Sequence, residues 1–141
     1  MNWTLPALVL CLSFSLEAAV KREFWPNGKL KKRVIESPGT QKITTYYENG
    51  QAAHYHELKN GKYNGLVIDY DSNGNLINSE TYQAGNLSGK SYYQKFTEEG
   101  ESKGDVEEFY EKGVLRRRIE KNNDGKVMKD FKYLPNGELD N

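Results

Sequence analysis

The chain has 141 residues, 36% of them hydrophobic and 28% charged, which is the composition of one globular domain and excludes a disordered tail. Its 20 basic residues balance 20 acidic residues, so no overall field favours nucleic acid, and an electrostatic partner must be recognised locally. Ten tyrosines and thirteen glycines favour strands joined by tight turns.

The first nineteen residues are predicted to form an export signal. Residues 5–16 are almost wholly apolar or small and carry no charge, whereas the rest of the chain is strongly polar. This stretch is too short to anchor in a bilayer, and Ala18 or Ala19 supplies the small residue before a cleavage site. We therefore expect residues 1–19 to be a signal peptide and residues 20–141 to be exported, to a periplasm or to the outside of the cell. The alternative is that the stretch is a buried first strand or helix.

Cys11 is the only cysteine, and it lies inside the apolar stretch. The mature protein would then contain neither a disulfide nor a catalytic thiol. Lipid modification of Cys11 is an alternative, but Leu10 stands where a lipoprotein signal normally carries Gly, Ala or Ser.

A short repeat follows the signal segment, because six aromatic residues each precede a glycine by four positions. The pairs are Phe24 and Gly28, Tyr46 and Gly50, Tyr70 and Gly74, Phe96 and Gly100, Phe109 and Gly113, and Tyr133 and Gly137. In four of the six the residue before the glycine is Asn, and Asn-Gly suits a two-residue hairpin turn in which both residues take a positive φ. Each unit is therefore predicted to be a strand that ends in a turn.

A second class of glycines lies between these turns, eleven or twelve residues after a glycine of the first class. Its members are Gly39, Gly61, Gly85 and Gly125. Turn signals at this spacing indicate an antiparallel meander, and a full period near twenty-four residues indicates a repeat array. No window between the glycines is long enough for a stable helix.

Alternating apolar residues support the strands. Leu66, Ile68 and Tyr70 would share one face of a strand, and the repeated aromatic residue is predicted to face the core. The spacing contracts between Phe96 and Phe109, which predicts one shortened hairpin with an irregular loop at residues 97–105.

The units resemble the MORN repeat family, in particular the variant units of bacterial antitoxin or immunity-type proteins. The resemblance covers about residues 23–139, and its carriers are the segments 46–50, 58–65, 70–74 and 82–90. The copies at the two ends are weaker, as is usual for the end units of an array. The resemblance implies a ribbon of stacked hairpins that contacts proteins or membranes and has no conserved active site.

Two segments offer alternatives based on metal binding. One segment satisfies the pattern of an EF-hand calcium loop, with Asp69, Asp71, Asn73, Gly74, Leu76 and Glu80, but glycines flank it where an EF-hand has helices. His54 and His56 would point to one face of a strand, yet two ligands do not make a metal site. We therefore expect a hairpin turn at the first segment, a solvated or partly packed strand face at the second, and neither a metal nor another cofactor.

Two basic clusters follow turns at comparable places in the sequence. They consist of Lys29, Lys31, Lys32 and Arg33 after Gly28, and of Arg116, Arg117 and Arg118 after Gly113. Stacked strands could align these clusters into a stripe that meets an acidic partner or anionic head groups. The alternative is that the charges only protect exposed strands from edge-to-edge aggregation.

The sequence thus predicts an all-β fold, an antiparallel meander of stacked β-hairpins that forms an elongated MORN-like repeat sheet. The expected function is a non-catalytic protein-interaction module, with a toxin as the possible partner. A membrane-surface scaffold is the main alternative, followed by a calcium-binding protein or an enzyme.

Overall fold

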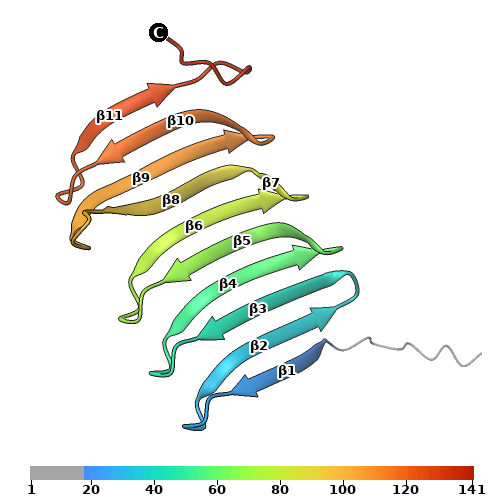
Figure 1. Cartoon of the computed structure of the whole chain (residues 1–141). Coiled ribbons are helices and arrows are strands. Elements are labelled where there is room, and N and C mark those ends of the chain that lie inside the picture. The colour runs from blue at the N-terminus through green and yellow to red at the C-terminus, as the bar shows by residue number, and fades with distance from the viewer. Residues whose placement is uncertain (1–17) are drawn as a thin grey trace, which may run out of the picture.

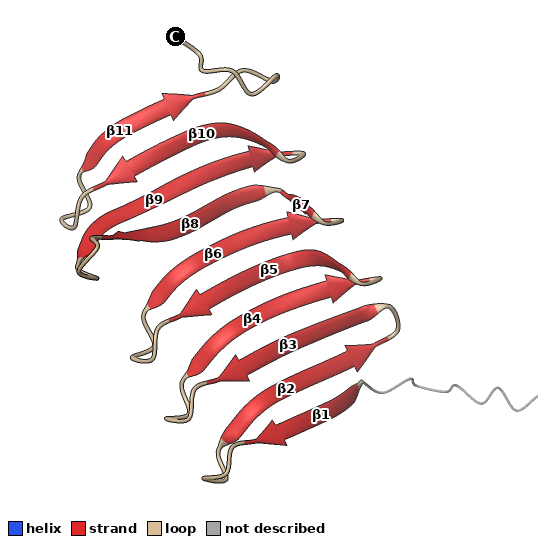
Figure 2. Cartoon of the chain, in the orientation of Figure 1, coloured by secondary structure: helices blue, strands red, loops and turns tan. Residues whose placement is uncertain are grey.

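The computed structural model describes residues 18–141, which form one antiparallel β-sheet (Figure 1). The predicted signal segment up to residue 17, with Cys11, lies outside the described residues. Figure 2 shows strands and turns and no helix in the part of the chain that is described. The strands are β1 (Ala19–Phe24), β2 (Leu30–Ser37), β3 (Thr40–Tyr46), β4 (Ala52–Lys59), β5 (Lys62–Tyr70), β6 (Leu76–Gln83), β7 (Asn86–Leu87), β8 (Gly89–Phe96), β9 (Ser102–Glu111), β10 (Val114–Lys121) and β11 (Val127–Lys132).

The order of the strands in the sheet follows their order in the chain, which confirms the predicted meander of hairpins (Figure 1). One interruption occurs after β6. There the chain pairs first through β7 and then, past Ser88, through β8, which has only two register pairs with β6, Asn78 with Tyr93 and Ser79 with Tyr92.

Long turns close the hairpins at one end of the strands, along the side of the sheet where β1, β3 and β5 end. In each of them the glycine N–H donates to the carbonyl three residues earlier, as Gly28 does to Trp25 and Gly50 to Tyr47. The glycine has a positive φ and the residue before it does not. These are three-residue loops, a type I turn followed by a left-handed glycine, and not the two-residue Asn-Gly turns that the sequence predicted.

Short turns close the hairpins at the opposite end of the strands. Three of them place two successive residues at positive φ, in the pairs Asn60-Gly61, Ala84-Gly85 and Lys112-Gly113. This is the two-residue turn whose twist matches the flanking strands. Gly39 provides the positive φ in the remaining turn, after Pro38.

The assignment of two glycines to turn classes was wrong. Gly113 lies in a short turn between β9 and β10, and Gly125 lies in a long turn, where its N–H donates to the Asn122 carbonyl. The predicted irregular loop at 97–105 is therefore absent, because a regular long turn ends at Glu101 and β9 begins at Ser102. Both turn types need a left-handed residue, so glycine spacing alone does not separate them.

The sheet is a single layer, and its buried core is small. Ile43, Val67, Val106 and Ile119 are the buried hydrophobic residues among those described, and Val106 is 0% exposed. The described residues form no second layer over the sheet, so side chains are covered by their neighbours on the same face.

The repeated aromatic residues do not form this core. None of the six is buried, and Phe24 and Phe96 are 59% and 48% exposed. Phe24, Tyr46, Tyr70 and Phe96 lie instead where the strand register shifts beside a long turn. Such bulges bend and twist strands, which accords with the curved strands in Figure 2.

The asparagine of the long turn bridges neighbouring hairpins. Asn27 Nδ2 donates to the Glu48 carbonyl at 3.0 Å, and Asn49 Nδ2 donates to the Ser72 carbonyl at 2.6 Å. The Asn49 Oδ1 atom also accepts from the Gln51 N–H within its own turn. Two of the four asparagines that precede a turn glycine, Asn27 and Asn49, thus bridge successive turns, a role that a hairpin rule does not contain.

Replacing Asn49 with Asp is expected to destabilise the protein by about 1 kcal/mol, because the aspartate keeps the acceptor for Gln51 but loses the donor to Ser72. Urea denaturation measures the change. The matched control is Asn136→Asp, since Asn136 Nδ2 donates only to the nearby Glu138 side chain. Equal midpoints for the two variants would show that the bridge contributes nothing.

Candidate binding face

The register of the strands assigns their side chains to two faces. Residues directly opposite one another on antiparallel strands share a face, and successive residues of a strand alternate. The face that carries Ile43, Val67 and Val106 also carries buried Ser91 and Glu108, and we call it the packed face. The other face is called the basic face.

The basic face carries an excess of positive charge that the neutral composition conceals. Its register positions hold nine basic residues and five acidic ones. The basic residues are Arg22, Arg33, Lys42, Lys59, Lys62, Lys90, Arg117, Lys121 and Lys132, and the acidic ones are Glu57, Asp105, Glu107, Glu111 and Asp130. The packed face is close to balanced, with Lys21, Lys32, Lys95, Arg118 and Lys129 against Glu23, Glu36, Asp69, Glu80, Glu108 and Glu120.

Carboxylates neutralise the basic face mainly over its C-terminal strands. Glu107 lies 2.8 Å from Lys90 and 3.0 Å from Lys121. Arg117 donates two hydrogen bonds to Asp130, at 2.9 and 2.7 Å. The hydrogen bond from Lys90 lowers the pKa of Glu107, and that from Arg117 lowers the pKa of Asp130. These carboxylates therefore remain charged at neutral pH.

The seven residues predicted to contact a partner do not form one stripe. Arg33 and Arg117 lie on the basic face, whereas Lys32 and Arg118 lie on the packed face. The two clusters lie on β2 and β10, near opposite ends of the sheet (Figure 1). Gly28 lies in a long turn and Gly113 in a short turn at the opposite end of the strands, so the clusters are not at equivalent places in the repeat.

The other three predicted residues lie at turns or bulges. Lys29 Nζ donates to the Asn49 carbonyl at 2.9 Å, and the Lys31 ammonium lies 4.7 Å from the ring centroid of Trp25. Arg116, at the register shift of β10, lies 3.9 Å from Glu111. Partner binding by the seven residues stays a prediction.

Sequence reasoning missed most of the basic face. Arg22, Lys42, Lys59, Lys62 and Lys90 come from five different strands, so no run of basic letters marks them. The signal that remains in the sequence is the alternation of each lysine or arginine with residues of the other face. Reading it requires the cross-strand register, which only the fold supplies.

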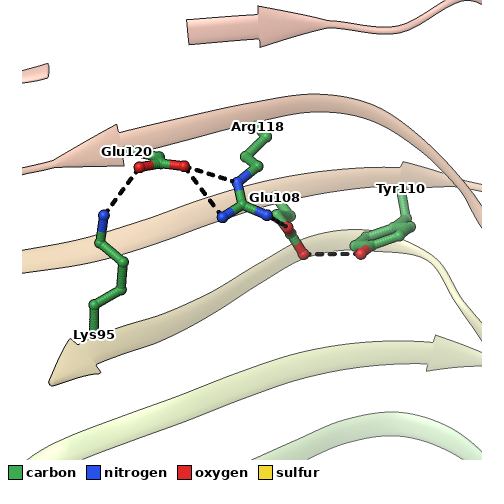
Figure 3. Close-up of polar contacts among 5 residues, drawn as sticks. All are labelled: Lys95, Glu108, Tyr110, Arg118 and Glu120. Atoms are coloured by element: carbon green, nitrogen blue, oxygen red, sulfur yellow. Dashed lines mark hydrogen bonds and ion pairs between the residues drawn. The ribbon is translucent and has the colours of Figure 1, made fainter. Parts of the chain in front are cut away.

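A polar network holds the C-terminal part of the packed face together (Figure 3). Arg118 lies 3.3 Å from Glu108 and 3.1 Å from Glu120, and Glu120 also lies 3.0 Å from Lys95. Tyr110 donates its hydroxyl hydrogen to Glu108 at 2.8 Å. Each carboxylate in this network has a cationic partner, so the network is suited to joining β8, β9 and β10.

Tyr82 and Glu80 repeat the tyrosine–glutamate contact on β6. The Tyr82 hydroxyl donates to Glu80 at 2.9 Å, and burial together with this bond raises the pKa of Tyr82 to about 12. Burial also raises the pKa of Tyr110. Both hydroxyls therefore stay protonated at neutral pH and act as hydrogen-bond donors to carboxylates.

His54 and His56 point to the same face of β4, as predicted, and this is the packed face; their ring centroids lie 4.9 Å apart. His54 Nδ1 contacts Asp69, which also accepts from Asn78 Nδ2 at 3.2 Å. Burial lowers the pKa of His56. Within residues 18–141, no group of three or more His, Cys, Asp or Glu side chains is placed to hold a metal ion.

The segment with the EF-hand pattern is a hairpin made of β5, a long turn and β6. Both Asp71 carboxylate oxygens accept hydrogen bonds inside the turn, from the N–H groups of Asn73 and Asn75 and from Asn75 Nδ2. These bonds lower the pKa of Asp71, and the bond from Asn75 Nδ2 contributes most to the lowering. The carboxylate therefore acts as a cap for the turn.

Millimolar calcium is expected to leave the melting temperature unchanged, because a ligand raises it only by binding to the folded state. Differential scanning fluorimetry with and without chelator makes the comparison. A calcium-dependent rise that Asp71→Ala abolishes would contradict this expectation and restore the calcium-loop alternative.

Comparison with known families identifies one repeat unit. The sequence model of the MORN repeat variant family matches residues 63–84, which span β5, its long turn, β6 and the first residue of the next short turn. The resemblance to MORN repeats is thus confirmed for this unit, and it indicates a repeat module for protein or membrane contacts. A search of curated proteins gave no match. The described part of the chain contains no helix of the length and apolarity needed to cross a membrane.

Proposed function

We propose that this protein is a non-catalytic interaction module that binds an acidic surface of a partner protein with its basic face. The observation that carries the proposal is the separation of charge between the two faces of an open, single-layered sheet. Basic residues outnumber acidic ones nine to five on one face, although the whole chain is neutral. A surface of this kind attracts and orients an acidic partner before contact.

Three exposed lysines on the basic face of β3, β4 and β5 are suited to this contact. Lys59 and Lys62 lie directly opposite one another on β4 and β5, and neither lies within 4.0 Å of a carboxylate of the described residues. Like charges opposite one another cost stability, so their arrangement favours a ligand of opposite charge. Lys42, on the next strand, has only a distant partner, Glu57 at 3.8 Å.

The finer role that we propose is neutralisation of a toxin, with an acidic patch on the toxin as the contact. Its support is the likeness to MORN variant units, one of which is matched at residues 63–84. Export is part of the same proposal. Strand β1 begins at Ala19, so cleavage after Ala18 would leave every strand intact, and N-terminal sequencing of the mature protein tests it.

A pull-down from a cell-envelope extract tests the proposed face. Replacing Lys42, Lys59 and Lys62 together with Ser is expected to reduce retention of the partner roughly tenfold at low salt, since exposed charge pairs contribute up to about 1 kcal/mol each. High salt should reduce retention by the wild type towards the same level, because exposed charges are screened.

The matched control removes three charges from the packed face, with Lys21, Lys32 and Lys129 replaced by Ser. It should retain the partner as the wild type does. Equal losses in the two triple variants would place the contact elsewhere. Flotation with anionic vesicles tests the membrane alternative. Vesicle binding without capture of any protein would show that the basic face binds a membrane surface and not a protein.

A further inference from the structure

Two arginines face each other at the N-terminal end of the basic face. Arg22 on β1 and Arg33 on β2 are direct cross-strand partners. Side chains at such positions start from Cβ atoms about 5 Å apart, and like charges there destabilise the sheet. Thr44 is the next residue in the same row, on β3.

No carboxylate of the described residues neutralises this pair. The acidic residues nearest in sequence, Glu23 and Glu36, lie on the packed face, where Glu23 lies 4.0 Å from Lys32 and Glu36 lies 2.8 Å from Lys21. Among the residues that the structure describes, neither Arg22 nor Arg33 forms an ion pair. The other two arginines with a register partner, Arg117 and Arg118, both form ion pairs.

The second observation is an unused donor. Arg33 Nε is buried, and it is one of two buried side-chain nitrogen or oxygen atoms in the described residues that have no hydrogen-bond partner. Leaving a buried charged donor unpaired costs free energy, and native structures rarely do so without a reason. The remainder of the Arg33 side chain is half-buried and Arg22 is exposed, so the pair is open to solvent on one side.

We infer that Arg22 and Arg33 form a binding site for a dianionic oxyanion. Suitable ligands are inorganic phosphate, a phosphate monoester and sulfate. Two guanidinium groups supply two positive charges and parallel N–H donors, which match the charge and the oxygen atoms of such a group. A bound oxyanion would accept from the guanidinium groups of both arginines and relieve the repulsion between them. This site is distinct from the proposed protein contact on Lys42, Lys59 and Lys62 and does not depend on it.

Thermal unfolding of the full chain tests the site with sodium phosphate against sodium chloride at equal ionic strength. Phosphate is expected to raise the melting temperature of the wild type by about 5 °C more than chloride does, when it is present at roughly ten times its dissociation constant. Arg22→Gln and Arg33→Gln should each abolish this difference. Lys59→Gln, which removes one charge from the same face, should retain it.

Arg33→Lys separates charge from geometry, because lysine keeps the positive charge but lacks Nε and the fork, so the phosphate effect should fall by more than half. Arg22→Gln, at an exposed position, also keeps the test valid if Arg33 variants fold poorly. At low ionic strength without phosphate, Arg22→Gln should melt at or above the wild-type temperature, since the like charges are no longer opposed.

Vesicle flotation distinguishes a free anion from a lipid head group as the source of the phosphate. Binding to phosphatidate vesicles that is lost in Arg22→Gln assigns the site to a head group, and a phosphate effect in solution without such binding assigns it to a free anion. The inference is overturned if phosphate and chloride act alike on the wild type, if Arg22→Gln keeps the full phosphate effect, or if Arg22→Gln lowers the melting temperature without phosphate.

Discussion

Gly104→Ala is expected to destabilise the sheet by about 4 kcal/mol or more, which is a large fraction of the roughly 5–15 kcal/mol that stabilises a typical folded domain. Gly104 is buried in β9 at φ +101°, a backbone conformation that side chains rarely adopt. A Cβ atom there would lie 2.0 Å from the Lys121 carbonyl oxygen and 2.8 Å from backbone atoms of Asn122. These atoms belong to the main chain at the end of β10, so relief requires β9 and β10 to separate.

The matched control is Gly100→Ala in the long turn that precedes β9. Gly100 has a similar φ of +86°, but an added Cβ meets no atom within 4 Å. Its cost should therefore be that of the left-handed conformation alone, about 1 kcal/mol. Urea denaturation monitored by tyrosine fluorescence compares the two variants, and similar midpoints would contradict the close approach at Gly104.

The meander could be predicted from sequence because its signal is local. Gly28, Gly50 and Gly74 each take a positive φ in a turn, and each follows an aromatic residue at the end of a strand. The same local signal does not indicate at which end of the strands a turn lies. Gly113 has the aromatic offset of a long turn, yet it follows Lys112 at positive φ in a short one.

The two faces could not be predicted because bulges interrupt the alternation of side chains. A register shift occurs beside every long turn, so counting by two from β1 into β2 fails between Glu23 and Phe24. Arg22 and Arg33 become neighbours only through pairing across that hairpin. For this reason a run such as Arg116 to Arg118 looked like one site, although its members lie at a bulge, on the basic face and on the packed face.

The prediction that the repeated aromatic residues face the core was wrong for a different physical reason. In a single-layered sheet the middle of a strand is covered by neighbours on both sides, whereas its ends near the turns are open. Val106 and Val67 lie in the middle of their strands and are 0% and 6% exposed, while the large ring of Phe24 ends its strand and stays 59% exposed. Position in the strand therefore outweighs side-chain size in deciding burial here.

Arg118→Met is expected to cost about 3 kcal/mol, since removing the half-buried cation leaves the charge of the buried Glu108 without compensation. Arg118 bridges Glu108 and Glu120 on the packed face (Figure 3), and the Glu108 residue is only 9% exposed. Glu120 retains Lys95 at 3.0 Å after the change, but Glu108 retains only the hydroxyl of Tyr110. The loss should therefore arise mainly at Glu108.

Two further variants distinguish the cost of leaving the Glu108 charge uncompensated from a general effect of losing an arginine. Arg117→Met, one position earlier on the basic face, breaks an exposed pair with Asp130 and should cost at most about 1 kcal/mol. Adding Glu108→Gln to Arg118→Met should recover part of the loss, because the neutral amide no longer carries a charge to bury.

The pH dependence has a definite sign. The hydrogen bond from Lys95 lowers the pKa of Glu120 from 4.5, so Glu120 stabilises the wild type above that pH, and this contribution is lost as the pH falls through the lowered pKa. The charge of Arg118 contributes to this lowering, so Arg118→Met removes part of the pH-dependent stabilisation that Glu120 provides. The difference in unfolding free energy between wild type and variant should therefore be largest near pH 7 and shrink as the pH falls below about 4.5. Denaturation midpoints measured at both pH values give this difference, and a gap that stays constant or widens in acid would mean that Arg118 acts through packing and not through its charge.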